Sequence, residues 1–382
     1  MKPSLLVVTG EISGDSHTGA VLQALRTIRP DVQLWGIGGP ASRAAGMATL
    51  HDIEEMAVMG LWDVLLRLPF FRRVFREVLA EADRRKPTAA LLVDYPGFNM
   101  RLAAELKQRD IPVLYYICPQ VWAWRRSRIR RIAEIVDRLL VLFPFEAELF
   151  SDTGLETEWV GHPLADTDTS SEPDVLSEAD WPGTPRIAIL PGSRRQEIEK
   201  NLPVLLEAAR RVSDTHPGAG FRIAAASDRA AALAQRILDA TPSLPGELRL
   251  VSGQTQSILR SADAAWVTSG TATLEAAIQG CPTVVVYRTA LLTYLAAKAV
   301  VRIPTIGLVN IVAGRTVCPE LIQHNATPKA LAAAIEPLLS DTEERRCMVK
   351  SMEDVTRKLG AGNAYARTAD AIDRFLSCRS KS

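Results

Sequence analysis

The sequence predicts an α/β protein with two doubly wound parallel sheets. In both halves of the chain, short apolar runs alternate with amphipathic helical stretches, and single helices between strands favour right-handed crossovers into a parallel sheet. A polar, proline-containing stretch at 164–185 separates the halves, and 382 residues are enough for two domains with their own cores. We expect an N-terminal domain over 1–165, a linker over 166–185, a second domain over 186–340 and C-terminal helices over 341–382.

The strands are expected where short apolar runs are bounded by turn residues. In the first half they are Leu5–Thr9, Gln33–Ile37, Ala89–Val93, Val113–Ile117 and Leu139–Phe143, with helices among them at His17–Thr27, Phe71–Arg84, Asn99–Gln108 and Arg125–Val136. In the second half they are Arg186–Leu190, Phe221–Ala226, Leu248–Val251, Ala264–Val267 and Thr283–Tyr287. The helical region that closes the chain is too long for one crossover, so we expect it to pack back across the domains or to pair with a second chain.

Composition excludes several classes of protein. A hydrophobic content of 47% describes a globular chain, and a net charge of +1 argues against general nucleic-acid binding. The 5 cysteines and 5 histidines show no metal-binding spacing, which predicts reduced thiols and no zinc site. The sequence shows neither a secretory signal nor a long uncharged apolar run, so we expect a cytoplasmic protein that is soluble or lies on a membrane surface.

A glycine-containing turn links a strand to a helix early in the second half. Ile187–Leu190 fits a buried strand, and Pro191-Gly192-Ser193 interrupts it before a helical pattern begins. Backbone N–H groups and the positive helix end at such a turn favour a bound phosphate. Ser193 fits a helix cap, and the Arg194 guanidinium fits a phosphate oxygen pair. By itself the pattern also fits a tight turn with a solvated arginine.

A second turn of the same kind favours the phosphate-binding interpretation over the tight turn with a solvated arginine. Ser269-Gly270-Thr271 follows the apolar run Ala264–Val267 and begins another helix, with Glu275 one helical turn later. Two phosphate-binding turns in one domain predict a nucleoside diphosphate. Its phosphates would lie against the backbone N–H groups, and its ribose hydroxyls would bind Glu275.

Carboxylates follow two strands of the first half, where doubly wound sheets bind their ligands. The turn Gly10-Glu11-Ile12-Ser13-Gly14-Asp15 follows the first strand, although Asp15 also fits a cap of the next helix. Asp94 follows the third strand, and burial there would raise its pKa and suit it to act as a general base. An aspartate that merely caps the following turn is equally compatible with the sequence.

Tryptophans and arginines follow the fourth strand. Trp122 and Trp124 with Arg125 and Arg126 fit a site for a sugar face and an anionic group. They also fit packing residues beside a solvated basic helix.

Two amphipathic stretches meet at the break Leu68-Pro69-Phe70-Phe71-Arg72-Arg73. Apolar residues at helical spacing are Leu61, Val64, Leu65 and Leu68 before Pro69, which is expected to end that helix, and Phe71, Val74, Phe75, Val78 and Leu79 after it. Such faces usually pack on a core. The break is apolar and basic together, which also suits contact with anionic lipid.

Seven motifs along nearly the whole chain resemble one family. They are Gly10-Glu11-Ile12-Ser13-Gly14-Asp15, Val58-Met59-Gly60, Asp94-Tyr95-Pro96-Gly97-Phe98-Asn99, Val121-Trp122-Ala123-Trp124-Arg125, Leu190-Pro191-Gly192-Ser193-Arg194, Ser269-Gly270-Thr271-Ala272-Thr273-Leu274-Glu275 and Asn310-Ile311-Val312-Ala313-Gly314-Arg315. Their order and spacing resemble lipid-A-disaccharide synthase, although Cys118-Pro119-Gln120 stands where Ser-Pro-Ser is expected. The resemblance implies a glycosyltransferase of the GT-B class, with two Rossmann-like domains facing a central cleft.

The family's reaction joins UDP-2,3-diacylglucosamine to 2,3-diacylglucosamine 1-phosphate. It yields a β-1,6-linked disaccharide 1-phosphate and UDP, a step toward lipid A of Gram-negative bacteria. The α-linked donor and β-linked product imply direct attack by the acceptor's 6-hydroxyl with one general base. The resemblance makes Asp94 the first choice for this base and Glu11 the second.

The resemblance also implies the remaining site residues. The donor-site candidates are Gly192, Ser193, Arg194, Gly270, Thr271, Glu275, Arg288 and Asn310; the acceptor-site candidates are Ser13, Asn99, Trp124 and Arg125; and the membrane-facing candidates are Leu61, Leu65, Leu68, Phe70 and Phe71. No metal and no cofactor are expected, because the UDP-sugar is a substrate and helix dipoles with cations can stabilise the departing diphosphate. The acylated substrates imply peripheral association with the cytoplasmic face of the inner membrane, and the C-terminal helices suit a homodimer.

Two kinds of rival remain open. One is another GT-B enzyme, such as a UDP-N-acetylglucosamine 2-epimerase or the transferase that makes lipid II. The other is a non-catalytic protein that binds a nucleotide sugar. Carboxylates after strands of both halves favour an enzyme over a sensor.

Overall fold

The chain forms two compact units. The first comprises residues 1–167 and 359–382, and the second comprises residues 168–358. The computed structural model describes residues 2–56, 67–122, 127–166, 176–177, 180–291, 294, 298 and 303–379. The candidates Leu61, Leu65, Trp124 and Arg125 lie outside the described residues, as do Arg126 and the motif Val58-Met59-Gly60.

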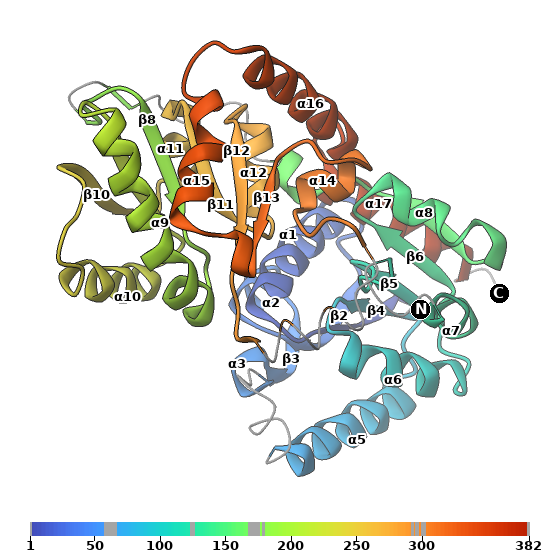
Figure 1. The fold of residues 1–382 in the computed structure, drawn as a ribbon. Coiled ribbons are helices and arrows are strands. Elements are labelled where there is room, and N and C mark those ends of the chain that lie inside the picture. The colour runs from blue at the N-terminus through green and yellow to red at the C-terminus, as the bar shows by residue number, and fades with distance from the viewer. Residues whose placement is uncertain are drawn as a thin grey trace. The chain divides into compact units, whose positions relative to one another are not determined.

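A parallel sheet forms the centre of the first unit (Figure 1). Its strands are β1 (Ser4–Thr9), β2 (Gln33–Gly38), β3 (Ala48–Asp52), β4 (Ala89–Val93), β5 (Val113–Tyr116), β6 (Arg138–Val141) and β7 (Glu156–Trp159). Their spatial order among the described residues is β3-β2-β1-β4-β5-β6-β7, and every neighbouring pair is parallel. Strands β1 and β4 are therefore central and are apolar on both faces, as a sheet covered by helices on both sides requires.

Helices cover both faces of this sheet. They are α1 (Ile12–Ile28), α2 (Pro40–Ala44), α3 (Ile53–Met56), α5 (Leu68–Arg85), α6 (Pro96–Lys107), α7 (Arg128–Ile135), α8 (Pro144–Glu148) and α17 (Ala364–Arg379), with 3-10 turns at Ser151–Thr153 and Pro163–Asp166. Helices α5, α6 and α7 contribute to one core with the sheet. Helix α17 packs against α1, so the end of the chain returns to the first unit.

The second unit repeats the architecture with a smaller sheet (Figure 1). Its strands are β8 (Arg186–Leu190), β9 (Gly220–Ala225), β10 (Glu247–Ser252), β11 (Ala264–Thr268), β12 (Thr283–Tyr287) and β13 (Glu320–Ile322), in the parallel order β10-β9-β8-β11-β12-β13. Its helices are α9 (Arg195–Thr215), α10 (Asp228–Asp239), α11 (Thr255–Ser261), α12 (Ala272–Ile278), α14 (Leu308–Ala313), α15 (Pro328–Ile335) and α16 (Glu343–Leu359), with 3-10 turns at Gln323–Asn325 and Glu336–Leu338. The predicted α/β fold with two parallel sheets is confirmed.

The strands that the sequence pattern missed all lie at sheet edges. They are β3, β7 and β13, whose residues are mostly half-buried or exposed. An edge strand needs no continuous apolar run, because one side of it faces solvent. Pro69 lies in the first turn of α5, where its missing N–H group costs no helical hydrogen bond. The helix that was expected to end before it falls on residues 61–66, outside the described residues, so that expectation stays a prediction.

Candidate active site

The strand order creates a switch point in the first unit. The chain moves outward from β1 through β2 to β3, and β4 then returns to the other side of β1. Ligands of doubly wound sheets bind at the carboxyl ends of the two strands where the order reverses. Thr9 pairs with Val93 at this edge, so Glu11 and Asp94 follow adjacent strand ends. The structure therefore brings the two predicted catalytic carboxylates together.

Asp94 has the electrostatic surroundings of a general base. Its side chain is half-buried, and this burial, together with the nearby Glu11 carboxylate, raises the pKa of Asp94 to about 6. A carboxylate with a pKa near the working pH can both accept a proton and release it again. Glu11 itself is exposed at the N-cap position of α1, without a capping hydrogen bond from its side chain.

The backbone after β4 adopts an uncommon conformation. Asp94 and Tyr95 are consecutive non-glycine residues with φ values of 46° and 49°. Left-handed backbone is rare for residues with a Cβ, particularly bulky ones, and persists where the surrounding structure enforces it. The Tyr95 ring lies directly over Gly10, where a Cβ atom would come within 2.3 Å of ring carbons. Glycine at position 10 thus allows the two turns to approach.

The acceptor-site candidates occupy different depths. Ser13 is exposed in the first turn of α1, whereas Asn99 is fully buried in α6. The Asn99 side-chain amide donates to the carbonyl oxygens of Asp94 and Val93 at 2.8 and 3.1 Å. Burial and these bonds place Asn99 beneath the edge of the sheet, where it holds the backbone of the turn.

Asp15 caps a helix, but a different one from the helix that the sequence suggested. It lies within α1, is buried, and accepts hydrogen bonds from the backbone N–H groups of Gly39 and Ala41 at 2.7 and 2.9 Å. Both donors lie at the N-terminus of α2, so Asp15 stabilises that helix and packs it on α1.

Trp122 is a packing residue. Its ring is buried, and its Nε1–H group donates to Glu146 at 3.2 Å. Glu146 also accepts from the N–H groups of Leu142 and Phe143, and burial raises its pKa to about 7. For Trp122, the structure therefore favours the second of the two interpretations that the sequence left open.

The first turns of α5 combine apolar and basic side chains. Leu68, Phe70 and Phe71 are half-buried, and Phe70 and Phe71 pack against the core in which Val74 and Val78 are fully buried. The intervening Arg72 and Arg73 are exposed.

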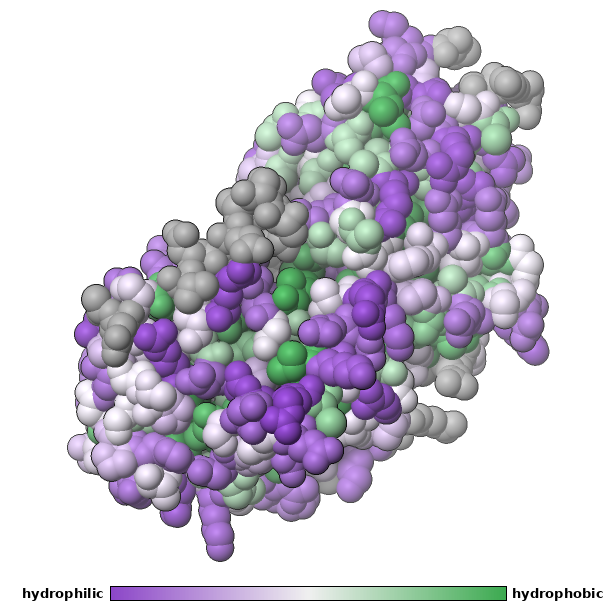
Figure 2. All heavy atoms as spheres, turned by 90° about the horizontal axis from the view of Figure 1, so that it is seen from above, coloured by the Kyte–Doolittle hydropathy of each residue, from purple (hydrophilic) through white to green (hydrophobic). Residues whose placement is uncertain are grey.

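On the face drawn in Figure 2, hydrophobic residues occupy small areas between hydrophilic ones. No helix among the described residues is long and apolar enough to cross a bilayer.

A second switch point lies in the second unit, between β8 and β11. Leu190 pairs with Val267 in the register of these strands. The two predicted phosphate-binding turns, at Gly192 and Gly270, therefore follow adjacent strand ends. Both glycines have positive φ values, 113° and 150°, which only glycine adopts readily.

Glu197 caps the helix that follows the first of these turns. Its carboxylate accepts hydrogen bonds from the backbone N–H groups of Ser193 and Arg194 at 3.1 and 3.2 Å. The N-cap residue is thus Arg194, and the suggestion that Ser193 caps the helix was wrong. The Ser193 amide, which was expected to hold a phosphate, is therefore paired within the chain. The Arg194 side chain is 82% exposed, and its Nη1 atom forms an ion pair with Glu197 Oε1 at 3.1 Å.

The other donor-site candidates are distributed around the same sheet edge. Thr271 is exposed, and Glu275 is half-buried in α12, where burial raises its pKa. Arg288 follows β12 with an exposed side chain, and its backbone N–H group donates to the buried Asn201 at 2.8 Å. Asn201 in turn lies 3.5 Å from the carbonyl oxygen of Pro191, so it connects the first turn to the end of β12.

Asn310 is buried and fully hydrogen-bonded. Its amide donates to the carbonyl of Cys318 and to Glu320, and its Oδ1 accepts from the N–H groups of Val317 and Cys318. A hydrogen bond between the Asn310 side chain and a bound UDP-sugar would therefore require one of these four bonds to break. Its evident role in the structure is to hold the turn after α14.

Sequence reasoning missed three residues that organise these edges: Asn201, Glu197 and Tyr115, whose hydroxyl donates to the carbonyl oxygen of Asp94 at 2.6 Å. Tyr115 and Asn201 lie in a strand and a helix, where the apolar pattern identifies packing but no partner. Glu197 had a detectable signal, because a glutamate three residues after an N-cap is typical of a helix start.

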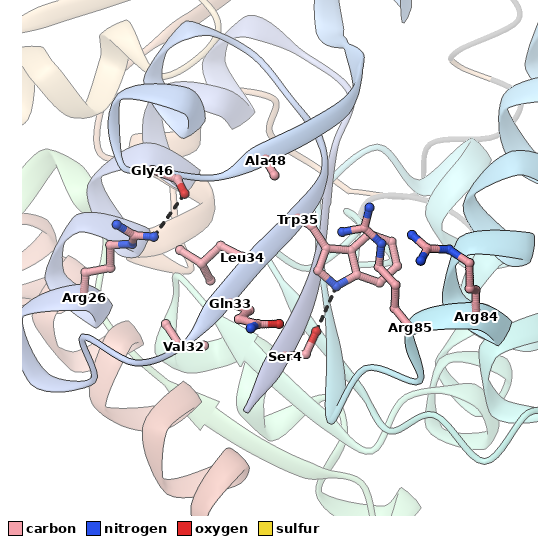
Figure 3. A pocket seen from close by; sticks show the side chains of 10 residues that line it. All are labelled: Ser4, Arg26, Val32, Gln33, Leu34, Trp35, Gly46, Ala48, Arg84 and Arg85. Carbon is pink, nitrogen blue, oxygen red and sulfur yellow. Dashed lines mark hydrogen bonds between the residues drawn. The ribbon is translucent and has the colours of Figure 1, made fainter. Parts of the chain in front are cut away.

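The cavity with a volume of about 510 Å³ in the first unit lies away from these residues. Its lining includes the first residues of three strands, Ser4, Gln33 and Ala48, so it lies at the amino edge of the sheet. Figure 3 shows the Arg85 guanidinium over the Trp35 ring, 4.7 Å from its centroid, and the Trp35 Nε1–H group donating to Ser4. The carboxyl edge with Glu11 and Asp94 is the better candidate for chemistry.

Comparison with known proteins identifies the family. The family model described as "Lipid-A-disaccharide synthetase" matches residues 5–372. A lipid-A-disaccharide synthase of Anaeromyxobacter dehalogenans (strain 2CP-C) is 41% identical over 370 residues, which are 96% of each chain.

Solved structures share the fold. The glycotransferase of kitacinnamycin has a TM-score of 0.63 at 17% identity and covers 98% of this chain and 100% of its own. A UDP-GlcNAc 2-epimerase from Neisseria meningitidis has a TM-score of 0.62 at 12% identity, and the match covers 97% of this chain and 100% of the epimerase chain. The predicted family and the GT-B fold are confirmed.

Proposed function

Because the chain belongs to the lipid-A-disaccharide synthase family, we propose that it catalyses that family's transfer with the residues described above. The donor would be UDP-2,3-diacylglucosamine and the acceptor 2,3-diacylglucosamine 1-phosphate. The match of the family model over residues 5–372 carries the proposal. The proximity of the Asp94 and Glu11 carboxylates at the first switch point supports it.

Asp94 acts as the base in this proposal. Its carboxylate takes the proton of the acceptor's 6-hydroxyl while that oxygen forms a bond to the anomeric carbon of the donor. The bond from the anomeric carbon to the β-phosphate oxygen breaks, and UDP leaves with the electron pair. Attack opposite the leaving group inverts the α-linked donor to a β-1,6-linked product. The raised pKa of Asp94 supports this role, because it makes the carboxylate a stronger base than an ordinary aspartate.

The second switch point holds the donor in this proposal. The exposed Arg194 guanidinium stabilises the negative charge that develops on the departing diphosphate. The turn at Gly270 lets backbone approach the phosphates, and Glu275 binds the ribose. Arg288 completes this end of the site from the neighbouring strand, and Asn201 fixes its backbone.

Release of UDP from the donor, with and without the acceptor, tests the proposal. We expect release that depends on 2,3-diacylglucosamine 1-phosphate and a disaccharide product by mass spectrometry. Conversion of UDP-N-acetylglucosamine without an acceptor would instead support an epimerase. Tight UDP binding without turnover on either substrate would support a non-catalytic binding protein.

The first turns of α5 contact the membrane surface in this proposal, on the cytoplasmic side of the inner membrane. Half-buried Leu68, Phe70 and Phe71 beside exposed arginines support it, because apolar and basic groups together bind anionic lipid surfaces. We expect Arg73→Glu to weaken binding to anionic phospholipid vesicles by about tenfold in a sedimentation assay, because it reverses one charge near the surface.

A matched charge reversal lies at the other end of the same helix. Arg84 is exposed to the same degree as Arg73, with side-chain values of 64% and 62%. Arg84→Glu should leave vesicle binding within about twofold, because a charge more than a Debye length from the surface contributes little. Equal losses in both variants would show that net charge, and not the N-terminus of α5, governs binding.

The transfer proceeds without a metal ion or cofactor in this proposal, because arginine and oriented backbone dipoles supply the stabilising charge. We expect acceptor-dependent UDP release to keep its rate after treatment with EDTA and dialysis. A rate that falls with EDTA and recovers with Mg²⁺ would contradict this expectation.

The protein is a homodimer in this proposal, with α17 packed on α1 of its own chain. Light scattering of the purified protein should then give the mass of two chains. The mass of a single chain at micromolar concentration would contradict it.

A further inference from the structure

The carbonyl group of Asp94 has an unusual environment. Its oxygen accepts two hydrogen bonds from side chains, one from Asn99 Nδ2 at 2.8 Å and one from the Tyr115 hydroxyl at 2.6 Å. A carbonyl oxygen has two lone pairs, so both are used. The Asp94 N–H group donates to the carbonyl of Tyr116 at 2.9 Å. The backbone of this residue is therefore held on both sides.

The two side-chain donors come from the two elements that follow Asp94 along the chain. Asn99 belongs to α6 and Tyr115 to β5, and both are fully buried. Neither side chain is exposed to a substrate. Asn99 also donates to Val93 at 3.1 Å and lies 3.4 Å from the carbonyl oxygen of Val8, so it connects the ends of β1 and β4. Both residues act on the point where the two central strands end.

The buried amide of Asn99 has one atom whose burial destabilises the protein. Its Oδ1 atom is buried and has no hydrogen-bond partner among the described residues. A buried polar atom without a partner destabilises a protein, and most buried polar atoms have one. An apolar residue would avoid this cost, so general stability does not explain the amide. Its donors explain it, because they bind the backbone beside Asp94.

We propose that Asn99 and Tyr115 are positioning residues that hold the left-handed backbone of Asp94 and thereby aim its carboxylate at the acceptor hydroxyl. The inference rests on the proposed function, in which Asp94 is the base. Left-handed backbone at two consecutive non-glycine residues needs such support. Displacement of a catalytic group by about 1 Å can slow a reaction by about 100-fold.

Tyr115→Phe tests this inference with a minimal change, because it removes the hydroxyl that donates to Asp94 and retains the ring. We expect kcat to fall by about tenfold to 100-fold, with KM for both substrates and the affinity for UDP within twofold. A carboxylate that is no longer held is better solvated, so the acid limb of the kcat/KM profile should move to lower pH. A purely structural residue would lower the active fraction and leave that limb in place.

Tyr116→Phe is the matched control. Tyr116 is the next residue of β5, equally buried, and lies near Thr368 of α17 on the other face of the sheet. Tyr116→Phe changes only the side chain and keeps the backbone carbonyl that accepts from the Asp94 N–H group, so kcat should stay within twofold of the native value and the pH profile should not move. Asn99→Ala is the second test and should lower kcat in the same way, with thermal melting measured to correct for any unfolded fraction.

The outcomes separate this inference from the function on which it rests. Absence of acceptor-dependent UDP release in the native protein would overturn the proposed function. If the native protein is active and Asp94→Asn is not, unchanged kcat and an unchanged acid limb in Tyr115→Phe would overturn the positioning role. A loss of kcat in Tyr115→Phe that only matches its unfolded fraction would overturn it as well.

Discussion

Asp94→Asn should lower kcat by about 10²- to 10⁴-fold, the usual contribution of a general base, while UDP affinity stays near its native value. The substitution keeps the shape of the side chain and removes its ability to take a proton. Isothermal titration with UDP and turnover with both substrates measure the two properties separately. Loss of folding or of UDP binding in this variant would show that Asp94 has a structural role.

The pH dependence of the native protein provides a second test of Asp94. Burial and the Glu11 charge raise the pKa of Asp94 to about 6, so a larger fraction of it is protonated at mildly acidic pH than of an ordinary aspartate. The base must be deprotonated, so kcat/KM should fall as the pH decreases through about 6. A profile that stays flat down to pH 5 would contradict this assignment.

Glu11→Gln distinguishes the two candidate bases. Burial is the larger cause of the raised pKa of Asp94, and the Glu11 charge adds to it; removal of that charge should move the acid limb of the kcat/KM profile to lower pH while most of the activity remains. If Glu11 is the base, the same variant should lose nearly all activity.

Arg194→Ala should lower kcat/KM for the donor by about 10²- to 10³-fold, as expected when one stabilising cation is removed from a developing charge. The Arg194 side chain is 82% exposed, so its ion pair with Glu197 is screened by solvent on the arginine side and the substitution should change the melting temperature little. Steady-state kinetics with varied donor and a thermal melt provide the two measurements.

Arg195→Ala is the matched control for this prediction. Arg195 is the next residue, is 77% exposed and pairs with Glu199 at 2.7 Å. Its replacement should leave kcat/KM within twofold. Similar losses in both variants would show that the positive charge of this helix start matters in general, without a specific role for Arg194.

Much of this protein could be predicted from local sequence. The interior strands were predicted because each is buried on both faces and therefore reads as a continuous apolar run, as Ala89–Val93 does. The positions of Glu11, Asp94, Gly192 and Gly270 within two residues of a strand end were predicted for the same reason. Seven motifs in order were enough to predict the family, which the comparisons confirmed.

Edge strands and helix starts were harder to predict from the sequence. The missed strands are half-exposed, and Pro69 gives the same signal whether a helix ends before it or begins with it. Trp122 could not be assigned from sequence either, because a tryptophan ring suits both a sugar face and a core. Its burial and its bond to Glu146 decide for packing.

The sequence by itself determined which residues follow strand ends, because burial and periodicity are properties of consecutive residues. Only the tertiary structure decided which strand ends are neighbours, and hence that Glu11 lies close enough to raise the pKa of Asp94. It also decided that Asn99 and Tyr115 bind the Asp94 carbonyl, and that Glu197 occupies amides beside Arg194. The physical reason is that hydrogen bonds and charge interactions depend on distances between side chains, and the order of strands in a sheet sets those distances.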